Sequence, residues 1–148
     1  MLQISTKDIV DILEVRQNME GLAAFYAALR MSYQQKEELK KVSEAYNAAV
    51  AAGSTPDMIK YDTVFHHLIV EGSGNKILVH MVEQLQELVL RFRYIYYDDF
   101  RRAEKMPAEH KEIFDAIKSG DTERARTAAD VHIDRLKEMI EDEKVLTE

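Results

Sequence analysis

Four ionisable side chains occupy positions where a helical reading of the sequence expects apolar residues: Asp62, His66, His110 and His132. Apolar residues flank them three, four or seven positions away, among them Met58, Phe65, Ile69, Ile113, Phe114, Ile117, Ala125, Ala128 and Leu136. Burial of an ionisable group is costly unless a partner or a metal ion compensates it. The pattern therefore predicts a polar site in the interior and makes these four residues its candidate ligands.

The spacing also predicts that the four side chains meet. His66 follows Asp62 by four residues, so both lie on one face of a helix. His110 stands ten residues before Gly120 and His132 stands twelve residues after it. Those separations are about 15 and 18 Å along two helices joined at that glycine, so the two imidazoles would face each other across an antiparallel pair.

Three imidazoles and one carboxylate suit a divalent first-row transition metal. We expect zinc or nickel in the first place, with manganese or iron as alternatives. The sequence has no cysteine, which excludes thiolate ligands and disulfides. A single histidine on an apolar face is more often a hydrogen-bonded core residue, so the competing interpretation is a metal-free polar network. His67 and His80 share their faces with charged residues and are expected to face solvent.

Arginines supply a second candidate feature. Arg16 and Glu20, four residues apart, interrupt an apolar stripe of the first predicted helix. They could form a buried or dimer-facing ion pair, or Arg16 could turn its planar donors toward an anionic effector. Arg91 is the second candidate for effector binding, with Arg93 beside it, and surface exposure is the alternative for both.

The elements that must position these residues are helices joined by short turns. Capping residues, prolines and glycines divide the chain into periodic segments without a strand pattern. We expect a first helix capped by Ser5 and ending near 30, then helices over about 33–51, 55–71 (capped by Thr55), 75–98, 107–119 and 121–144. On the fourth helix the predicted buried stripe is Leu78, Met81, Leu85, Leu88 and Phe92. The predicted fold is all-α, an antiparallel six-helix bundle.

The composition fits one water-soluble domain over residues 1–148, with its core over about 9–139. No apolar run approaches the roughly 18 residues that would span a membrane, and the N-terminus lacks the pattern of a secretory signal. We therefore expect a cytoplasmic protein without membrane contact. The net charge of −7 disfavours direct contact with DNA phosphates.

Several segments, taken in order, resemble the FCD (FadR C-terminal) domain of GntR-type transcription regulators, in its VanR-like branch. They are Glu14-Val15-Arg16 with Glu20 and Ala23-Ala24, Asp62-Thr63-Val64-Phe65-His66, Ser73-Gly74-Asn75, His110 to Ile117, and Gly120-Asp121 with His132. The resemblance spans roughly 9–139 and is specific in combination. It implies a helical bundle that binds a metal through an aspartate and three histidines, corresponding here to Asp62, His66, His110 and His132.

The resemblance also implies a small organic carboxylate as effector, a homodimer, and contact with DNA only through an attached winged-helix domain. No such domain precedes Ser5, so the chain is expected to be either an excised fragment or a stand-alone sensor. A metal-dependent enzyme is the alternative function, because a metal with open positions can activate water. The sequence lacks the His-Glu-x-x-His, Glu-x-x-His, Gly-x-Ser-x-Gly and phosphate-loop motifs, so we do not expect an enzyme.

Overall fold

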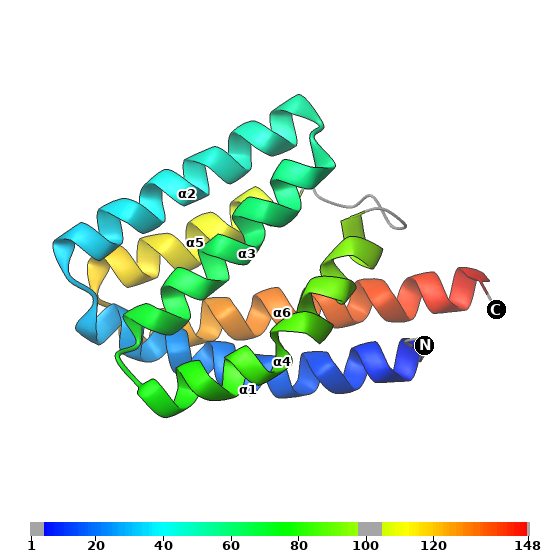
Figure 1. The fold of residues 1–148 in the computed structure, drawn as a ribbon, viewed down its shortest axis with the longest axis horizontal. Coiled ribbons are helices and arrows are strands. Elements are labelled where there is room, and N and C mark those ends of the chain that lie inside the picture. The colour runs from blue at the N-terminus through cyan, green and yellow to red at the C-terminus, as the bar shows by residue number, and fades with distance from the viewer. Residues whose placement is uncertain (1–4, 98–104, 148) are drawn as a thin grey trace.

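The computed structural model describes residues 5–97 and 105–147, and these fold into six helices without a strand. The helices are α1 (Thr6–Arg30), α2 (Tyr33–Ala52), α3 (Thr55–Gly72), α4 (Lys76–Ile95), α5 (Met106–Ser119) and α6 (Thr122–Thr147). α1 and α6 run antiparallel along one side, so the chain begins and ends at the same end of the bundle, while α2, α3 and α5 cover the other side (Figure 1). The all-α six-helix prediction is confirmed.

Local signals explain most helix boundaries. Ser5 and Asp8 form the expected capping box at the start of α1, and Asp121 accepts a hydrogen bond from the backbone N–H of Arg124 at 3.1 Å to cap α6. Gly120 ends α5 with a φ of +74°, a left-handed conformation that glycine adopts without strain. This tight turn brings α6 back antiparallel along α5.

Two boundaries differ from the expectation. Thr55 is the first residue of α3 rather than its cap, because Ser54 takes the extended cap conformation and Pro56 fits equally well in the first turn. The fourth helix is α-helical to Ile95 and continues as a π-turn at 96–97. Its expected end near Asp98 lies outside the described residues.

The predicted buried stripe of α4 is wrong at two positions. Met81 and Leu88 are 51% and 38% exposed, whereas Val82 and Val89 take their places against the bundle. α4 carries apolar residues on two faces, so its sequence pattern does not select one direction uniquely. The inward face of α4 therefore includes Val82 and Val89 beside Leu78, Leu85 and Phe92, and it includes Arg93 rather than Arg91.

Side chains of two kinds fill the interior. At one end, α1 and α6 meet through small residues, which we call the alanine region: Ala23, Ala24, Ala27, Ala28, Ala125, Ala128 and Ala129. Larger aliphatic and aromatic residues fill the other end, among them Leu13, Tyr46, Phe92, Ile133 and Ile140. Among the described residues no helix is long and apolar enough to cross a membrane.

Candidate metal and effector site

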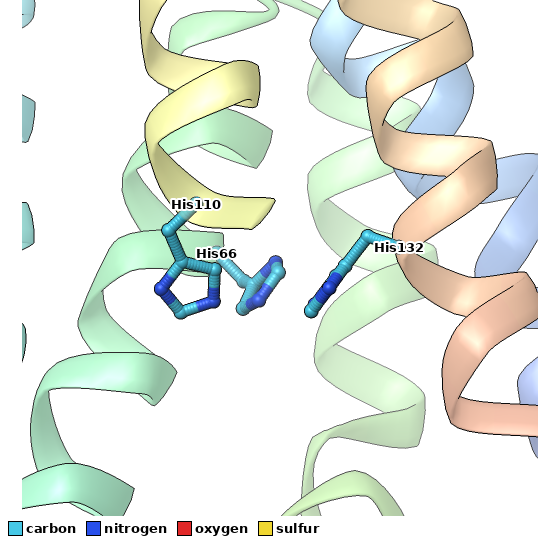
Figure 2. A group of neighbouring side chains, drawn as sticks. All are labelled: His66, His110 and His132. Carbon is cyan, nitrogen blue, oxygen red and sulfur yellow. The ribbon is translucent and has the colours of Figure 1, made fainter. Parts of the chain in front are cut away.

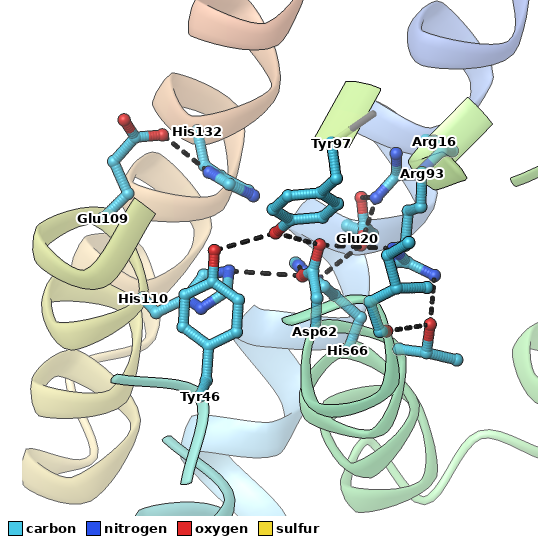
Figure 3. A network of polar contacts seen from close by, with 12 residues as sticks. Arg16, Glu20, Tyr46, Asp62, His66, Arg93, Tyr97, Glu109, His110 and His132 are labelled. Atoms are coloured by element: carbon cyan, nitrogen blue, oxygen red, sulfur yellow. Dashed lines mark hydrogen bonds and ion pairs between the residues drawn. The ribbon is translucent and has the colours of Figure 1, made fainter. Parts of the chain in front are cut away.

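A polar centre lies inside the bundle, where α3, α5 and α6 meet α1 and the end of α4 (Figure 3). We define it as Arg16, Glu20, Tyr46, Asp62, His66, Arg93, Tyr97, Glu109, His110 and His132. Among the members of this centre that form ion pairs, Glu20 is the most exposed, and only 12% of its side chain is accessible to solvent. The bundle therefore surrounds a group of ionisable residues that must satisfy one another or a bound ligand.

Three histidines meet at the middle of this centre. The side chains of His66, His110 and His132 come from α3, α5 and α6, and each offers a ring nitrogen within 4.8 Å of those of the other two (Figure 2). All three are buried, and His110 and His132 are at most 1% exposed. The α5–α6 hairpin brings His110 and His132 to the same height, as the spacing around Gly120 indicates, and their ring centroids are 5.3 Å apart.

Asp62 lies beside two of these imidazoles. Its Oδ1 is 3.0 Å from Nε2 of His66 and 3.4 Å from Nε2 of His110. Its Oδ2 accepts a hydrogen bond from the hydroxyl of Tyr97 at 2.9 Å and lies 3.4 Å from Nε of Arg93. Burial alone would raise the pKa of Asp62, but Arg93 and the histidines hold it well below its usual range, so Asp62 is a carboxylate.

Two further carboxylates stand behind the histidines. Glu20 Oε1 lies 2.8 Å from Nδ1 of His66, and Glu109 Oε1 lies 2.7 Å from Nδ1 of His132. An acceptor at Nδ1 favours the tautomer that carries its proton there and leaves Nε2 unprotonated. Histidines that bind metals usually have such a partner on the far nitrogen, so this arrangement prepares Nε2 of His132 as a ligand atom. Nε2 of His66 also lies beside a carboxylate, that of Asp62, and would have to lose its proton to bind a metal.

Buried ring nitrogens that lack a hydrogen bond indicate whether a metal ion fits this site. Both ring nitrogens of His110 and Nε2 of His132 are buried without a hydrogen bond. Such atoms are rare in folded proteins, and a metal ion would take the lone pair of one nitrogen on each ring. Burial lowers the pKa of His110 to about 4, which keeps this imidazole neutral and able to bind a metal near pH 7. The donor set therefore fits a divalent transition metal.

The two candidate arginines end up in different places. Arg16 is 5% exposed and pairs with Glu20 at 3.1 Å, while its Nη1 has no hydrogen bond. Arg91 is exposed and does not line the cavity that reaches His66, so its role in effector binding stays a prediction. Arg93 of α4 lies inside instead, where it meets Asp62.

A cavity leads from the surface to this centre between α1, α3 and α4. Its inner end is formed by Arg16, Glu20, His66 and Arg93, and its walls include Met19, Val70, Val79, Val82, Leu85 and Val89. Smaller spaces continue from Arg16 and His66 to Asp62 and His132. The cavity could therefore admit a small molecule to a metal held by the four candidate ligands.

Sequence reasoning missed three members of the polar centre. Glu109 lies four residues before Ile113 and three after Met106, which are both buried, so the stripe rule applied to α5 could have found it. Tyr97 donates to Asp62 and also contacts the hydroxyl of Tyr46 at 2.8 Å. No local pattern indicates these hydroxyl contacts, because they join segments that are far apart in the chain.

The chain is similar in sequence to bacterial regulators of transcription. The chain is 27% identical over 146 residues to the HTH-type transcriptional regulator YdhC of Bacillus subtilis, covering 95% of the chain and 65% of that protein. It is 30% identical over 128 residues to the putative L-lactate dehydrogenase operon regulatory protein of Escherichia coli, covering 83% of the chain and 48% of that protein. The chain thus spans between about half and two thirds of the length of these relatives.

A solved structure shows the same arrangement of helices. Escherichia coli McbR/YncC matches with a TM-score of 0.77 and 20% identity, over 97% of this chain and 66% of that chain. Both curated relatives are named as regulators of transcription, which favours a regulator over the metal-dependent enzyme. The FCD domain model matches residues 11–135. Because that match covers most of the sequence, the chain belongs to the FCD domain family.

Proposed function

We propose that this chain is the effector-binding domain of a transcription regulator and that it senses a small organic carboxylate through a bound divalent transition metal. Asp62, His66, His110 and His132 would hold the metal, zinc or nickel in the first place and manganese or iron as alternatives. The observation that carries the proposal is the meeting of three buried imidazoles within 4.8 Å, next to a buried carboxylate.

The surrounding charges support a ligand role for these residues. Glu20 and Glu109 orient two imidazoles from behind, and Arg93 keeps Asp62 ionised. A bound divalent ion would supply a Lewis-acid centre for one oxygen of a carboxylate. The free Nη1 of Arg16, at the inner end of the cavity, would donate a hydrogen bond to the same group.

The surface features suggest how the chain would act in a regulator. Its net charge of −7 opposes direct contact with DNA, so DNA would be bound by a winged-helix domain attached to it, in keeping with the HTH-type name of one relative. Such a regulator works in the cytoplasm. The domain would be the whole of residues 1–148 and would form a homodimer.

α4 has one face on the cavity and another exposed face at which a second copy of the chain could pack. One face of α4 lines the cavity through Val82 and Val89, and another leaves Ile77, Met81 and Leu88 exposed. An effector changes an equilibrium only if it binds two conformations with different affinity. Movement of α4 on the cavity side would therefore also move the exposed apolar residues at which a second copy could pack.

Two adjacent histidines provide a matched test of the metal site. His66 lies in the cluster, whereas His67 is 41% exposed and pairs with Glu71 at 3.1 Å. Zinc or nickel should raise the melting temperature of the unaltered chain and of His67→Gln, because a ligand that binds only the folded state stabilises it. His66→Gln should lose most of that increase.

The same measurement distinguishes the metal-free alternative. If the polar centre were only a hydrogen-bonded network, His66→Gln would lower the melting temperature, yet no metal would raise that of the unaltered chain. Elemental analysis should find stoichiometric metal in the purified unaltered chain and none in His66→Gln. A lack of any metal-dependent increase would overturn the proposal.

A further inference from the structure

The cavity is small and mostly apolar. It has a volume of about 60 Å³, which is room for roughly four to six water molecules. Six aliphatic or methionine side chains form its walls: Met19, Val70, Val79, Val82, Leu85 and Val89. Arg16, Glu20, His66 and Arg93 form the inner end, and the remaining polar residues of the lining are Thr63, His67, Glu83 and Gln86. The buried cations are therefore found at one end of the cavity only.

The charges at the inner end can be counted. The buried or nearly buried ionised groups are two arginines, Arg16 and Arg93, and three carboxylates, Glu20, Asp62 and Glu109. Arg135 lies 3.6 Å from Glu109, but its side chain is 55% exposed, so water screens this contact. With a divalent ion bound to neutral imidazoles, the centre would carry one net positive charge.

An uncompensated charge in the interior is strongly unfavourable. One anionic group on the effector would make the metal-loaded centre neutral, whereas two would leave it negative. A second carboxylate would also have to lie among the apolar walls or beside Thr63, His67, Glu83 or Gln86, and none of these described residues is a buried cation. Charge balance and wall composition thus select the same class of molecule.

We propose that the effector is a short monocarboxylate of about four or five carbons with an apolar tail, and that di- and tricarboxylates are excluded. This inference rests on the proposed metal-dependent function. The carboxylate binds the metal and the free Nη1 of Arg16, which is buried and lines both the cavity and the inner space beside Asp62. The tail lies against Val82 and Val89 of α4.

Butyrate and succinate test this proposal, because they have the same number of carbons and differ in whether the far end is a methyl group or a carboxylate. Calorimetric titration of the zinc-loaded chain should give at least about tenfold tighter binding of butyrate, since succinate would bury an extra charge. Arg16→Gln should weaken butyrate at least about tenfold when both proteins are saturated with zinc.

A reversal provides the sharpest control. Val82→Lys adds a cation to the wall, so the preference should shift at least about tenfold toward succinate. Succinate binding as tightly as butyrate to the unaltered chain would overturn the inference and leave the metal-dependent function standing. Zinc binding without binding of either acid would overturn the inference and the carboxylate part of the function. Failure to bind any of zinc, nickel, manganese and iron would overturn the proposed function itself.

Discussion

The alanine region and the polar centre are both buried, yet they satisfy opposite requirements. In the alanine region small side chains let α1 and α6 approach closely, and a Cβ built on nearby Gly21 would lie 2.7 Å from the carboxylate of Asp130. In the polar centre, by contrast, buried atoms remain without hydrogen bonds. Six of the seven such side-chain atoms in the described part of the chain belong to Arg16, Glu20, Asp62, His110 and His132.

This difference indicates a division of labour. Close packing without buried polar groups stabilises a fold, whereas unsatisfied polar atoms destabilise it unless a ligand completes them. Such atoms are kept mainly where a protein gains function from them. The alanine region should therefore determine the stability of the metal-free chain, and the polar centre should determine what the chain binds.

The largest expected effect comes from removing the unsatisfied nitrogens of His110. His110→Phe keeps an aromatic ring on Phe65, on which His110 now stacks at 4.4 Å. It removes both ring nitrogens, which lack a hydrogen bond, together with the 3.4 Å contact between Nε2 and Asp62. The free energy of unfolding of the metal-free variant should be about 1 to 3 kcal/mol higher than that of the unaltered chain, so the variant is more stable. Its stabilisation by zinc should disappear. Urea unfolding with and without zinc measures both changes.

Ala125→Leu is the matched change in the alanine region. Ala125 is completely buried and lies two helical turns from His132, so the added methyl groups would overpack the contact between α1 and α6. This variant should lose about 1 to 3 kcal/mol of stability and keep its zinc affinity. If Ala125→Leu lost zinc binding while His110→Phe retained it, the proposed division between the two regions would be wrong.

The candidate ligands could be predicted because each depends on a short stretch of sequence. Asp62 and His66 need only one helical turn, and His110 and His132 need only two helices joined at Gly120. The inward face of α4 could not be predicted in this way. Its residues Met81 and Val82 are both apolar, and only contact with α1 and α3 decides that Val82 turns inward. The same contact turns Arg93 inward and leaves Arg91 outside.

Loss of a carboxylate behind a histidine should have an intermediate effect. Glu109→Gln keeps the size of the side chain but weakens the acceptor that orients His132 through Nδ1. Removal of such a partner typically weakens metal affinity by about 10- to 100-fold. Glu112→Gln, three residues along the same helix, alters an exposed ion pair with Arg124 and should leave the affinity unchanged.

Competition with a coloured chelator gives both affinities directly. Equal zinc affinity for the unaltered chain and Glu109→Gln would mean that Glu109 only fills space beside His132. A readout of the imidazole tautomer by nitrogen NMR separates the two roles further. His132 should carry its proton on Nδ1 in the unaltered chain and lose this preference in Glu109→Gln.

The smallest expected effect is the pH dependence of zinc affinity. Burial alone would lower the pKa of His66, but Glu20 and Asp62 raise it above the ordinary 6.5, whereas burial lowers that of His110 to about 4. A metal needs unprotonated imidazoles, so below the raised pKa of His66 zinc affinity should fall about tenfold per pH unit, with release of about one proton. His110 should contribute no proton, because it is already neutral.

The sign for the metal-free chain is the reverse. A histidine whose folded-state pKa exceeds the unfolded value stabilises the fold below the unfolded pKa, and this contribution is lost as pH rises through the folded one. As pH rises above 6.5, zinc affinity should therefore increase while His66 contributes less to metal-free stability. Titration in buffers of different ionisation enthalpy counts the released protons. A count near two would show that a second imidazole of the polar centre is protonated, and the charge balance of the centre would then need revision.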